Sequence, residues 1–214
     1  SNHFPRETLI EVGAWDPFNV TEDADLGVRL ARLGYRVLPL DSSTYEEAVP
    51  ALRGWIRQRS RWLKGYMQTV LVHSRAPFGF VRILGLWPFF GFTVFIGGAV
   101  LTSLLAPPFW ALSLVMAWSG SERVLAAYGG VVIQTSFLSL VAGNGILTLM
   151  AILAPLKRRW PYLMPYGATV FFYWWLISAA AYKALWQLAR RPFYWEKTPH
   201  GFLPRARRRR AASR

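Results

Sequence analysis

The chain has 214 residues, 53% of them hydrophobic, and contains no cysteine, which excludes disulfide bonds and thiolate metal sites. Its formal net charge is +14, and residues 190–214 carry nine Lys or Arg against a single acid, Glu196. The arginine run at its end, residues 205–210, has no aromatic or groove-reading element with it, so we expect no nucleic acid partner. A bilayer with anionic headgroups is the expected partner, and a solvated end is the alternative.

Residues 1–49 have the composition of a mixed α/β segment. Turn and capping residues predict a short helix at 6–12, a second helix that begins at Thr21 and stops before Gly34, and a strand at 35–40. A helix followed by a strand predicts the end of an α/β domain. Because the chain begins at Ser1 inside such a segment, without a signal peptide, we expect it to be the C-terminal part of a longer protein.

Residues 50–76 form the next predicted segment, an amphipathic helix. Apolar and aromatic residues fall on one side at helical spacing: Leu52, Trp55, Ile56, Trp62, Leu63, Tyr66, Met67 and Val70. The other side carries Arg53, Arg57, Arg61 and Lys64. Such a helix tends to lie flat in a membrane interface. A calmodulin-type target helix has the same pattern, but the apolar segments that follow directly disfavour it.

Residues 77–189 contain three long stretches without Asp, Glu, Lys or Arg, at 83–121, 124–156 and 160–182. A spanning helix needs about 20 mostly apolar residues, so we expect four transmembrane helices at 84–105, 108–120, 128–153 and 163–188. A buried helical core is the alternative, disfavoured by the length of the uncharged stretches. The charge rule predicts both ends on the cytoplasmic side of the membrane, although Lys157, Arg158 and Arg159 then face outward against the rule.

Three short segments carry groups suited to sugar and phosphate chemistry. In Thr21-Glu22-Asp23, a carboxylate at a helix N-terminus can act as a base, although a helix cap is the commoner role. In Gln58-x-x-Arg61-Trp62, an amide, a guanidinium and an indole share one helical surface. An ordinary basic amphipathic helix is the alternative there.

The third segment, residues 190–203, follows the last predicted span and precedes a basic tail at 204–214. In it, Lys197 and Thr198 can donate hydrogen bonds to phosphate oxygens. Trp195 reads as an aromatic anchor, and His200, as a lone histidine, is more often structural.

The order and spacing of these segments resemble the membrane-integrated family-two glycosyltransferases, among them bacterial cellulose synthase catalytic subunits, from Ser1 to about Phe202. The resemblance implies that Asp23 is the catalytic base, with Thr21 and Glu22 beside it. It also implies that Gln58, Arg61 and Trp62 hold the acceptor sugar and the donor diphosphate. Residues 193–200 resemble the gating loop of that family, although their amino-acid sequence departs from the cellulose-synthase form. The resemblance implies that Trp195, Lys197, Thr198 and His200 are the gating-loop residues.

This resemblance implies the end of a GT-A domain followed by membrane helices, in a bacterial inner membrane. The implied reaction is inverting, processive transfer of a hexose from a UDP-sugar to a β-linked polysaccharide, which is translocated across the membrane. Single addition of a sugar to a lipid carrier is the alternative within the same enzyme class. A transporter component without catalysis, or a membrane anchor, fits the apolar segments and the tail but leaves Thr21-Glu22-Asp23 unexplained.

The donor diphosphate of such enzymes is held by Mg²⁺ or Mn²⁺, and the resemblance places the metal ligands upstream of Ser1. Asp23-Ala24-Asp25 matches the D-x-D pattern formally, but we assign Asp23 to base catalysis and expect Asp25 to be a helix cap. We therefore expect no metal ligands in this chain, and no activity from the chain by itself.

Overall fold

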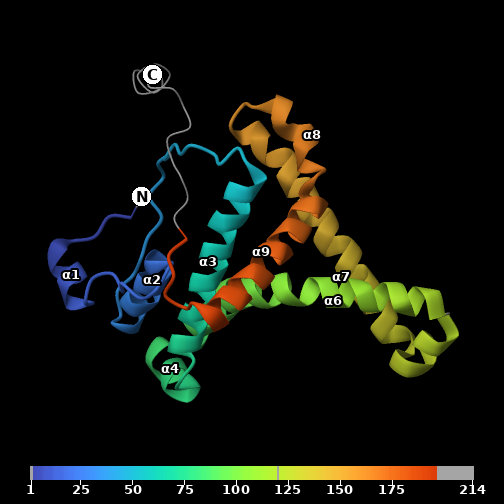
Figure 1. Ribbon diagram of the computed structural model, residues 1–214, viewed down its shortest axis with the longest axis horizontal. Coiled ribbons are helices and arrows are strands. Elements are labelled where there is room, and N and C mark those ends of the chain that lie inside the picture. The colour runs from blue at the N-terminus through green and yellow to red at the C-terminus, as the bar shows by residue number, and fades with distance from the viewer. Residues whose placement is uncertain (1, 120, 197–214) are drawn as a thin grey trace. The chain divides into compact units, whose positions relative to one another are not determined.

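The computed structural model describes residues 2–119 and 121–196, and every element of regular secondary structure in them is helical (Figure 1). The described residues form two compact units, 2–101 with 180–196 and 102–179, and helix α9 contributes to both. The elements are α1 (Arg6–Glu11), α2 (Glu22–Arg32), α3 (Leu52–His73), α4 (Pro77–Leu84), α5 (Leu86–Phe92), the π-helical turn η1 (Thr93–Gly97), α6 (Gly98–Ser119), α7 (Ser121–Lys157), the 3-10 turn η2 (Pro161–Leu163), α8 (Met164–Gly167) and α9 (Val170–Arg190).

The first two helices form where the sequence predicts them. Gly13 and Gly34 follow α1 and α2 with φ angles of 79° and 83°, in the left-handed region that glycine adopts without steric cost. The apolar sides of the two helices bury Val12, Leu26 and Leu30 against each other. Short helices gain most of their stability from such packing rather than from intrinsic propensity.

The predicted strand at 35–40 is wrong, and with it the α/β fold class. Residues 35–50 have no regular structure, and Leu38 and Leu40 are 81% and 75% exposed. A strand exists only when its N–H and C=O groups pair with a neighbouring strand, and no described residue provides one. The strand-like composition of this segment is therefore insufficient to make a strand.

Helix α3 is the central element of the first unit, and α2 packs alongside it (Figure 1). A second apolar cluster joins α2, α4 and α5 through Val28, Phe80 and Phe92, and the ring of His73 stacks on Phe80 at 5.7 Å. Lys64, predicted on the exposed basic side of α3, is instead fully buried. Helix α3 is thus enclosed on more than one side by its own unit, and its place in a membrane interface stays a prediction.

The prediction of four transmembrane helices is also wrong. Among residues 2–119 and 121–196, two helical stretches are long and apolar enough to cross a membrane, Leu86–Val115 and Gly129–Lys157. The two spans expected at 84–105 and 108–120 merge, because α5, η1 and α6 follow one another and α6 runs through Pro107 and Pro108. Prolines of this kind are tolerated inside apolar helices when neighbouring groups compensate for the missing N–H.

The span expected at 163–188 is divided between η2, α8 and α9, and α9 is not among the membrane candidates. Its C-terminal half carries Lys183 and Gln187 and buries Ala180, Ala181 and Ala184 within the first unit. In the second unit, α8 packs closely on α7: a Cβ added at Gly167 would lie 2.6 Å from the backbone nitrogen of Ile152.

Neither membrane candidate is buried by the protein: 17% of the residues in the apolar window of Leu86–Val115 are buried, and none of those in Gly129–Lys157. A core helix of a soluble protein would be mostly buried, because apolar surface exposed to water is unfavourable. The exposure of both stretches therefore argues against the buried-core alternative.

Candidate functional site

The segment Thr21-Glu22-Asp23 begins α2, and Thr21 attaches it to α3. The hydroxyl of Thr21 donates to the carbonyl oxygens of Arg61 and Trp62, at 3.4 and 3.3 Å, instead of capping its own helix. Its backbone N–H donates to Asn19 Oδ1 at 2.9 Å. The predicted acidic segment and the predicted Arg61-Trp62 pair are therefore in direct contact, although 40 residues separate them in sequence.

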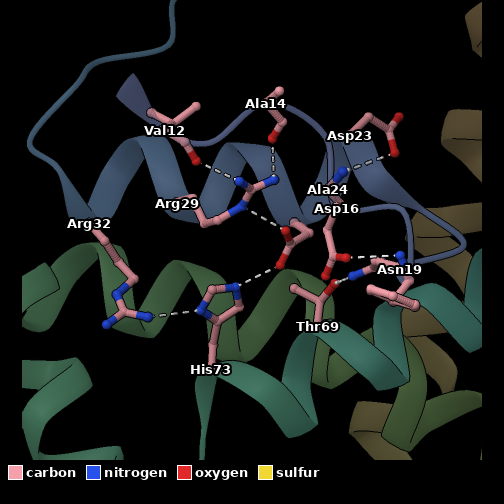
Figure 2. A network of polar contacts seen from close by, with 12 residues as sticks. Val12, Ala14, Asp16, Asn19, Asp23, Ala24, Arg29, Arg32, Thr69 and His73 are labelled. Carbon is pink, nitrogen blue, oxygen red and sulfur yellow. Dashed lines mark hydrogen bonds and ion pairs between the residues drawn. The ribbon is translucent and has the colours of Figure 1, made fainter. Parts of the chain in front are cut away.

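Asp23 is exposed in the first turn of α2. One carboxylate oxygen accepts the N–H of Ala24 at 2.9 Å (Figure 2). No ion pair engages this carboxylate within residues 2–119 and 121–196. Burial and the charge of Asp23 together raise the pKa of the Tyr66 phenol on α3. Asp23 is thus an accessible acceptor for a proton, whereas Glu22 is half-buried.

Gln58, Arg61 and Trp62 lie on α3 at helical spacing, but the structure divides them between two neighbourhoods. The guanidinium of Arg61 lies 4.8 Å from the ring of Trp195. Trp62 packs instead on the guanidinium of Arg59, at 4.4 Å. Gln58 is partly buried. The predicted common surface of these three side chains is therefore two adjacent aromatic and cationic clusters.

Two guanidinium nitrogens in these clusters are buried without a hydrogen bond in the described part of the chain. The Nε atoms of Arg59 and Arg61 are buried without a hydrogen-bond acceptor among the described residues. Buried N–H groups normally have a partner, and a charged donor without one is costly.

The segment that follows α9 lies along α3 and is held by four regularly spaced side chains. Gln68 donates to the carbonyl of Pro192 at 3.2 Å, Lys64 donates to the carbonyl of Tyr194, Arg61 stacks on Trp195, and Arg57 pairs with Glu196 at 3.4 Å. Positions 57, 61, 64 and 68 share one face of a helix, so residues 192–196 run antiparallel to α3. Of the predicted gating-loop residues, Trp195 is therefore placed, and Lys197, Thr198 and His200, like the basic tail at 204–214, lie outside the described residues.

Glu196 anchors the end of this segment, and sequence reasoning missed it. Its carboxylate accepts hydrogen bonds from Lys183 at 2.7 Å and from Gln187 at 2.9 Å, besides pairing with Arg57. Burial raises the pKa of Glu196, but the donors and the two positive charges outweigh it and hold the pKa below its usual value. The carboxylate therefore stays ionised at neutral pH.

Lys64 contributes the most deeply buried cation of the site. Its ammonium lies 5.8 Å from the ring centroid of Tyr194, and its side chain has no exposed surface. Burial lowers the pKa of Lys64, and the charge of Glu196 opposes this shift. The C-terminal segment thus covers a lysine that the sequence pattern placed at the surface.

The side-chain amide of Gln68 links the turn before α2 to the segment after α9, using its oxygen and its amide hydrogens. Its Oε1 accepts the N–H of Val20 at 3.1 Å, while its Nε2 donates to the carbonyls of Phe18 at 3.1 Å and Pro192 at 3.2 Å. The amide is buried and fully satisfied. The two segments that it links lie more than 170 residues apart.

We expect Gln68→Leu to lower the free energy of unfolding by about 2–3 kcal/mol, because one buried N–H and two carbonyls lose their partner. Chemical denaturation in detergent measures the change. Leu71→Ala, at an exposed position of the same helix, serves as the control and should change stability by less than about 0.5 kcal/mol. Equal effects of the two substitutions would show that the Gln68 bridge contributes nothing.

Asp25 is not a helix cap, as its position suggested, but the centre of a buried network. It accepts hydrogen bonds from Arg29 at 2.8 Å and from His73 on α3 at 2.9 Å. Arg29 also donates to the carbonyls of Val12 and Ala14, and Arg32 contacts the other ring nitrogen of His73 at 3.3 Å. The i, i+4 spacing of Asp25 and Arg29 was readable in the sequence, but the partner from α3 was not.

Burial raises the pKa of Asp25, but His73 and Arg29 outweigh it and lower the pKa below its ordinary value of 3.8. A carboxylate of this kind contributes stability above its unfolded pKa and loses it as pH falls through the folded pKa. We therefore expect wild-type stability to fall below about pH 4 partly through Asp25. Asp25→Asn should reduce that acid dependence and lower stability at pH 7 by about 3 kcal/mol. Thermal unfolding from pH 3 to 7 tests both, and an unchanged pH profile in the variant would refute the assignment.

No group of three or more His, Asp or Glu side chains suited to a metal ion occurs in the described part of the chain. Asp25 is turned to Arg29 and His73, so Asp23 and Asp25 do not act as a D-x-D pair. The residues present do not fit a divalent cation, and the Mg²⁺ or Mn²⁺ requirement stays a prediction about other parts of the protein.

The site joins an exposed carboxylate to clustered guanidinium and indole groups, which are side chains able to bind phosphate and sugar. Comparison with protein families agrees: residues 3–189 match the model for glycosyl transferase family group 2. The chain belongs to this family.

Two curated proteins are similar to it. The beta-monoglucosyldiacylglycerol synthase of Synechocystis sp. is 28% identical over 204 residues, which are 92% of this chain and 40% of the relative. The probable glycosyltransferase YdaM of Bacillus subtilis is 34% identical over 73 residues, 33% of this chain and 17% of the relative. The chain thus spans less than half the length of each relative. No solved structure matches it.

Proposed function

We propose that this chain forms part of a membrane-bound glycosyltransferase that transfers a hexose from a nucleotide sugar, such as a UDP-hexose, to a hydroxyl group of a lipid acceptor. The observation that carries the proposal is the position of the exposed Asp23 carboxylate. Its segment is held against α3 by hydrogen bonds from the Thr21 hydroxyl to the carbonyl oxygens of Arg61 and Trp62. The similarity of 92% of the chain to a glycolipid synthase supports the lipid as acceptor. The two unburied apolar stretches support a membrane location.

In this proposal, Asp23 accepts the proton of the acceptor hydroxyl while the hydroxyl oxygen attacks the anomeric carbon. The bond from that carbon to the diphosphate oxygen breaks, and the nucleoside diphosphate leaves. The anomeric carbon therefore has the inverted configuration in the product. Arg61 offsets the charge of the leaving group, and Gln58 and Trp62 orient the sugar. A divalent cation would neutralise the remaining diphosphate charge. Lys197, Thr198 and His200 are proposed as additional donors to the diphosphate.

A second candidate is processive synthesis of a β-linked polysaccharide, as in cellulose synthases. It is supported by the Gln58-x-x-Arg61-Trp62 motif and by the indoles of Trp55 and Trp62, which both lie against the Arg59 guanidinium and can stack on sugars. The growing polysaccharide would then be the acceptor and would pass through the membrane.

The test uses the complete protein that carries this chain, in proteoliposomes containing diacylglycerol and Mg²⁺ or Mn²⁺. Radiolabelled UDP-glucose and UDP-N-acetylglucosamine are supplied separately, and the products are separated by size and by extraction into organic solvent. Label in a chloroform-soluble monoglycosyl lipid supports the proposal. Label in high-molecular-weight polymer favours the processive candidate, and no transfer from either nucleotide sugar to lipid or polymer would overturn both.

A further inference from the structure

The second unit contains a cavity of about 480 Å³, and its walls are predominantly apolar. Helix α6 contributes residues from Thr102 to Ser113, α7 contributes Asn144 and Leu147, and α9 contributes residues from Phe171 to Ser178. Pockets of this size, roughly 300–1,000 Å³, enclose small organic ligands. Its aromatic lining residues are Phe109, Trp110, Phe171, Trp174 and Trp175.

The polar groups of the walls offer little to a polar ligand. The Ser113 hydroxyl donates to the carbonyl of Phe109 at 2.8 Å, within its own helix. Thr102, Ser103 and Asn144 each already have an interaction partner, and no charged residue lines the cavity. A lining with so little polar surface favours apolar molecules, because most hydroxyl groups of a sugar would lie against apolar atoms without a partner.

The surroundings of the cavity identify the apolar molecule. Its α6 wall belongs to the stretch Leu86–Val115, and its α7 wall to Gly129–Lys157, the two candidates for crossing a membrane. At hydrocarbon depth, the molecules available to fill an apolar cavity are lipid acyl chains. The ring of Trp110 meets that of Phe171 edge-to-face at 5.8 Å, which gives one wall a defined shape.

We propose that this cavity holds an acyl chain of the lipid acceptor. The inference rests on the proposed function, since it names the part of the protein that selects the lipid. Long acyl chains fill the cavity, and chains too short to reach it lose this binding energy. The cavity thereby determines specificity for the length of the acceptor's acyl chains, and it is separate from the residues that contact the sugar.

Leu147→Trp tests this directly, because the larger ring fills the cavity from α7. We expect the KM for a dioleoyl acceptor to rise by about fivefold or more, while the KM for a dioctanoyl acceptor and kcat with both lipids change less than twofold. Leu149→Trp is the matched control, since Leu149 lies on the same helix, is exposed and does not line the cavity. Equal changes for both acceptors, or the same changes in Leu149→Trp, would overturn the inference.

A second measurement does not depend on sugar transfer. A diacylglycerol with a diazirine near the end of its acyl chain is photolysed with the complete protein, and labelled peptides are mapped by mass spectrometry. Labels on the α6, α7 and α9 wall residues, removed by unlabelled diacylglycerol but not by a β-glucan oligosaccharide, support the site. Competition by the oligosaccharide, or labels confined elsewhere, would overturn it.

The two failures are distinguishable. Lipid glycosylation with labels only outside the cavity refutes the acyl-chain site and leaves the proposed function standing. If the cavity walls are labelled but no lipid receives sugar, the proposed acceptor is refuted. The cavity then binds a lipid that is not the acceptor.

Discussion

Asp23→Asn is expected to lower the rate of sugar transfer by about 10²–10⁴-fold, the usual contribution of a general base. Asparagine keeps the size of the side chain and can still accept the N–H of Ala24, but it cannot take a proton. Because the carboxylate is exposed and has no cationic partner in the described part of the chain, the substitution should leave the fold intact. The measurement is kcat for transfer by the complete protein, with its thermal unfolding recorded in parallel.

Glu7→Gln is the matched control, because Glu7 is also an exposed acid in the first turn of a helix, α1. It should leave kcat unchanged, since nothing places Glu7 near the acceptor. If Asp23→Asn retained full activity with an unchanged melting temperature, the assignment of the base would be wrong. A loss of activity accompanied by unfolding would show that Asp23 has a structural role instead.

Gly65→Ala is expected to destabilise the protein by about 2–3 kcal/mol, the usual cost of overpacking, and to displace the segment that carries Asp23. A Cβ at position 65 would lie 2.0 Å from Thr21 Oγ1, 2.3 Å from Thr21 Cβ and 2.7 Å from its backbone nitrogen. Rotation of the Thr21 side chain cannot relieve the contact with the backbone atom. Sugar transfer should therefore fall together with stability, and denaturant unfolding in detergent measures the latter.

Gly27→Ala supplies the opposite control. Gly27 lies inside α2, and a Cβ there would have no neighbour within 4 Å. Alanine is the better helix former, so this substitution should stabilise by about 0.5–1 kcal/mol. If Gly65→Ala raised stability as Gly27→Ala does, the close approach of Thr21 to α3 would not exist in solution.

The local signals in the sequence predicted the helices that carry the candidate site residues. Thr21 was placed at the start of α2, and Gln58, Arg61 and Trp62 were placed on one long helix. These predictions hold because caps, glycine stops and helical periodicity act over a few residues. Gly65 was the readable signal that went unused, since a glycine inside a strong helical pattern often marks a close approach.

The pairings of the site were beyond the reach of those signals. Gln68 binds Val20, Phe18 and Pro192, and Asp25 binds His73, across 48 to 124 positions of sequence. A polar residue on a helix has several possible partners of similar energy, and only the packed arrangement selects one. The same reason explains why Lys64 was predicted at the surface and lies buried under Tyr194.

The sequence by itself determined the positions of α1, α2 and α3 and of the acidic, basic and aromatic segments, because each depends on the chemistry of neighbouring residues. Tertiary structure decided whether a segment with strand-forming residues became a strand, and whether a helix continued through its prolines. Residues 35–40 have strand-forming chemistry but no strand to pair with, and Pro107 and Pro108 have helix-breaking chemistry within a helix that continues. Strand pairing and helix packing are interactions between distant segments, so their free energies are not contained in any local pattern.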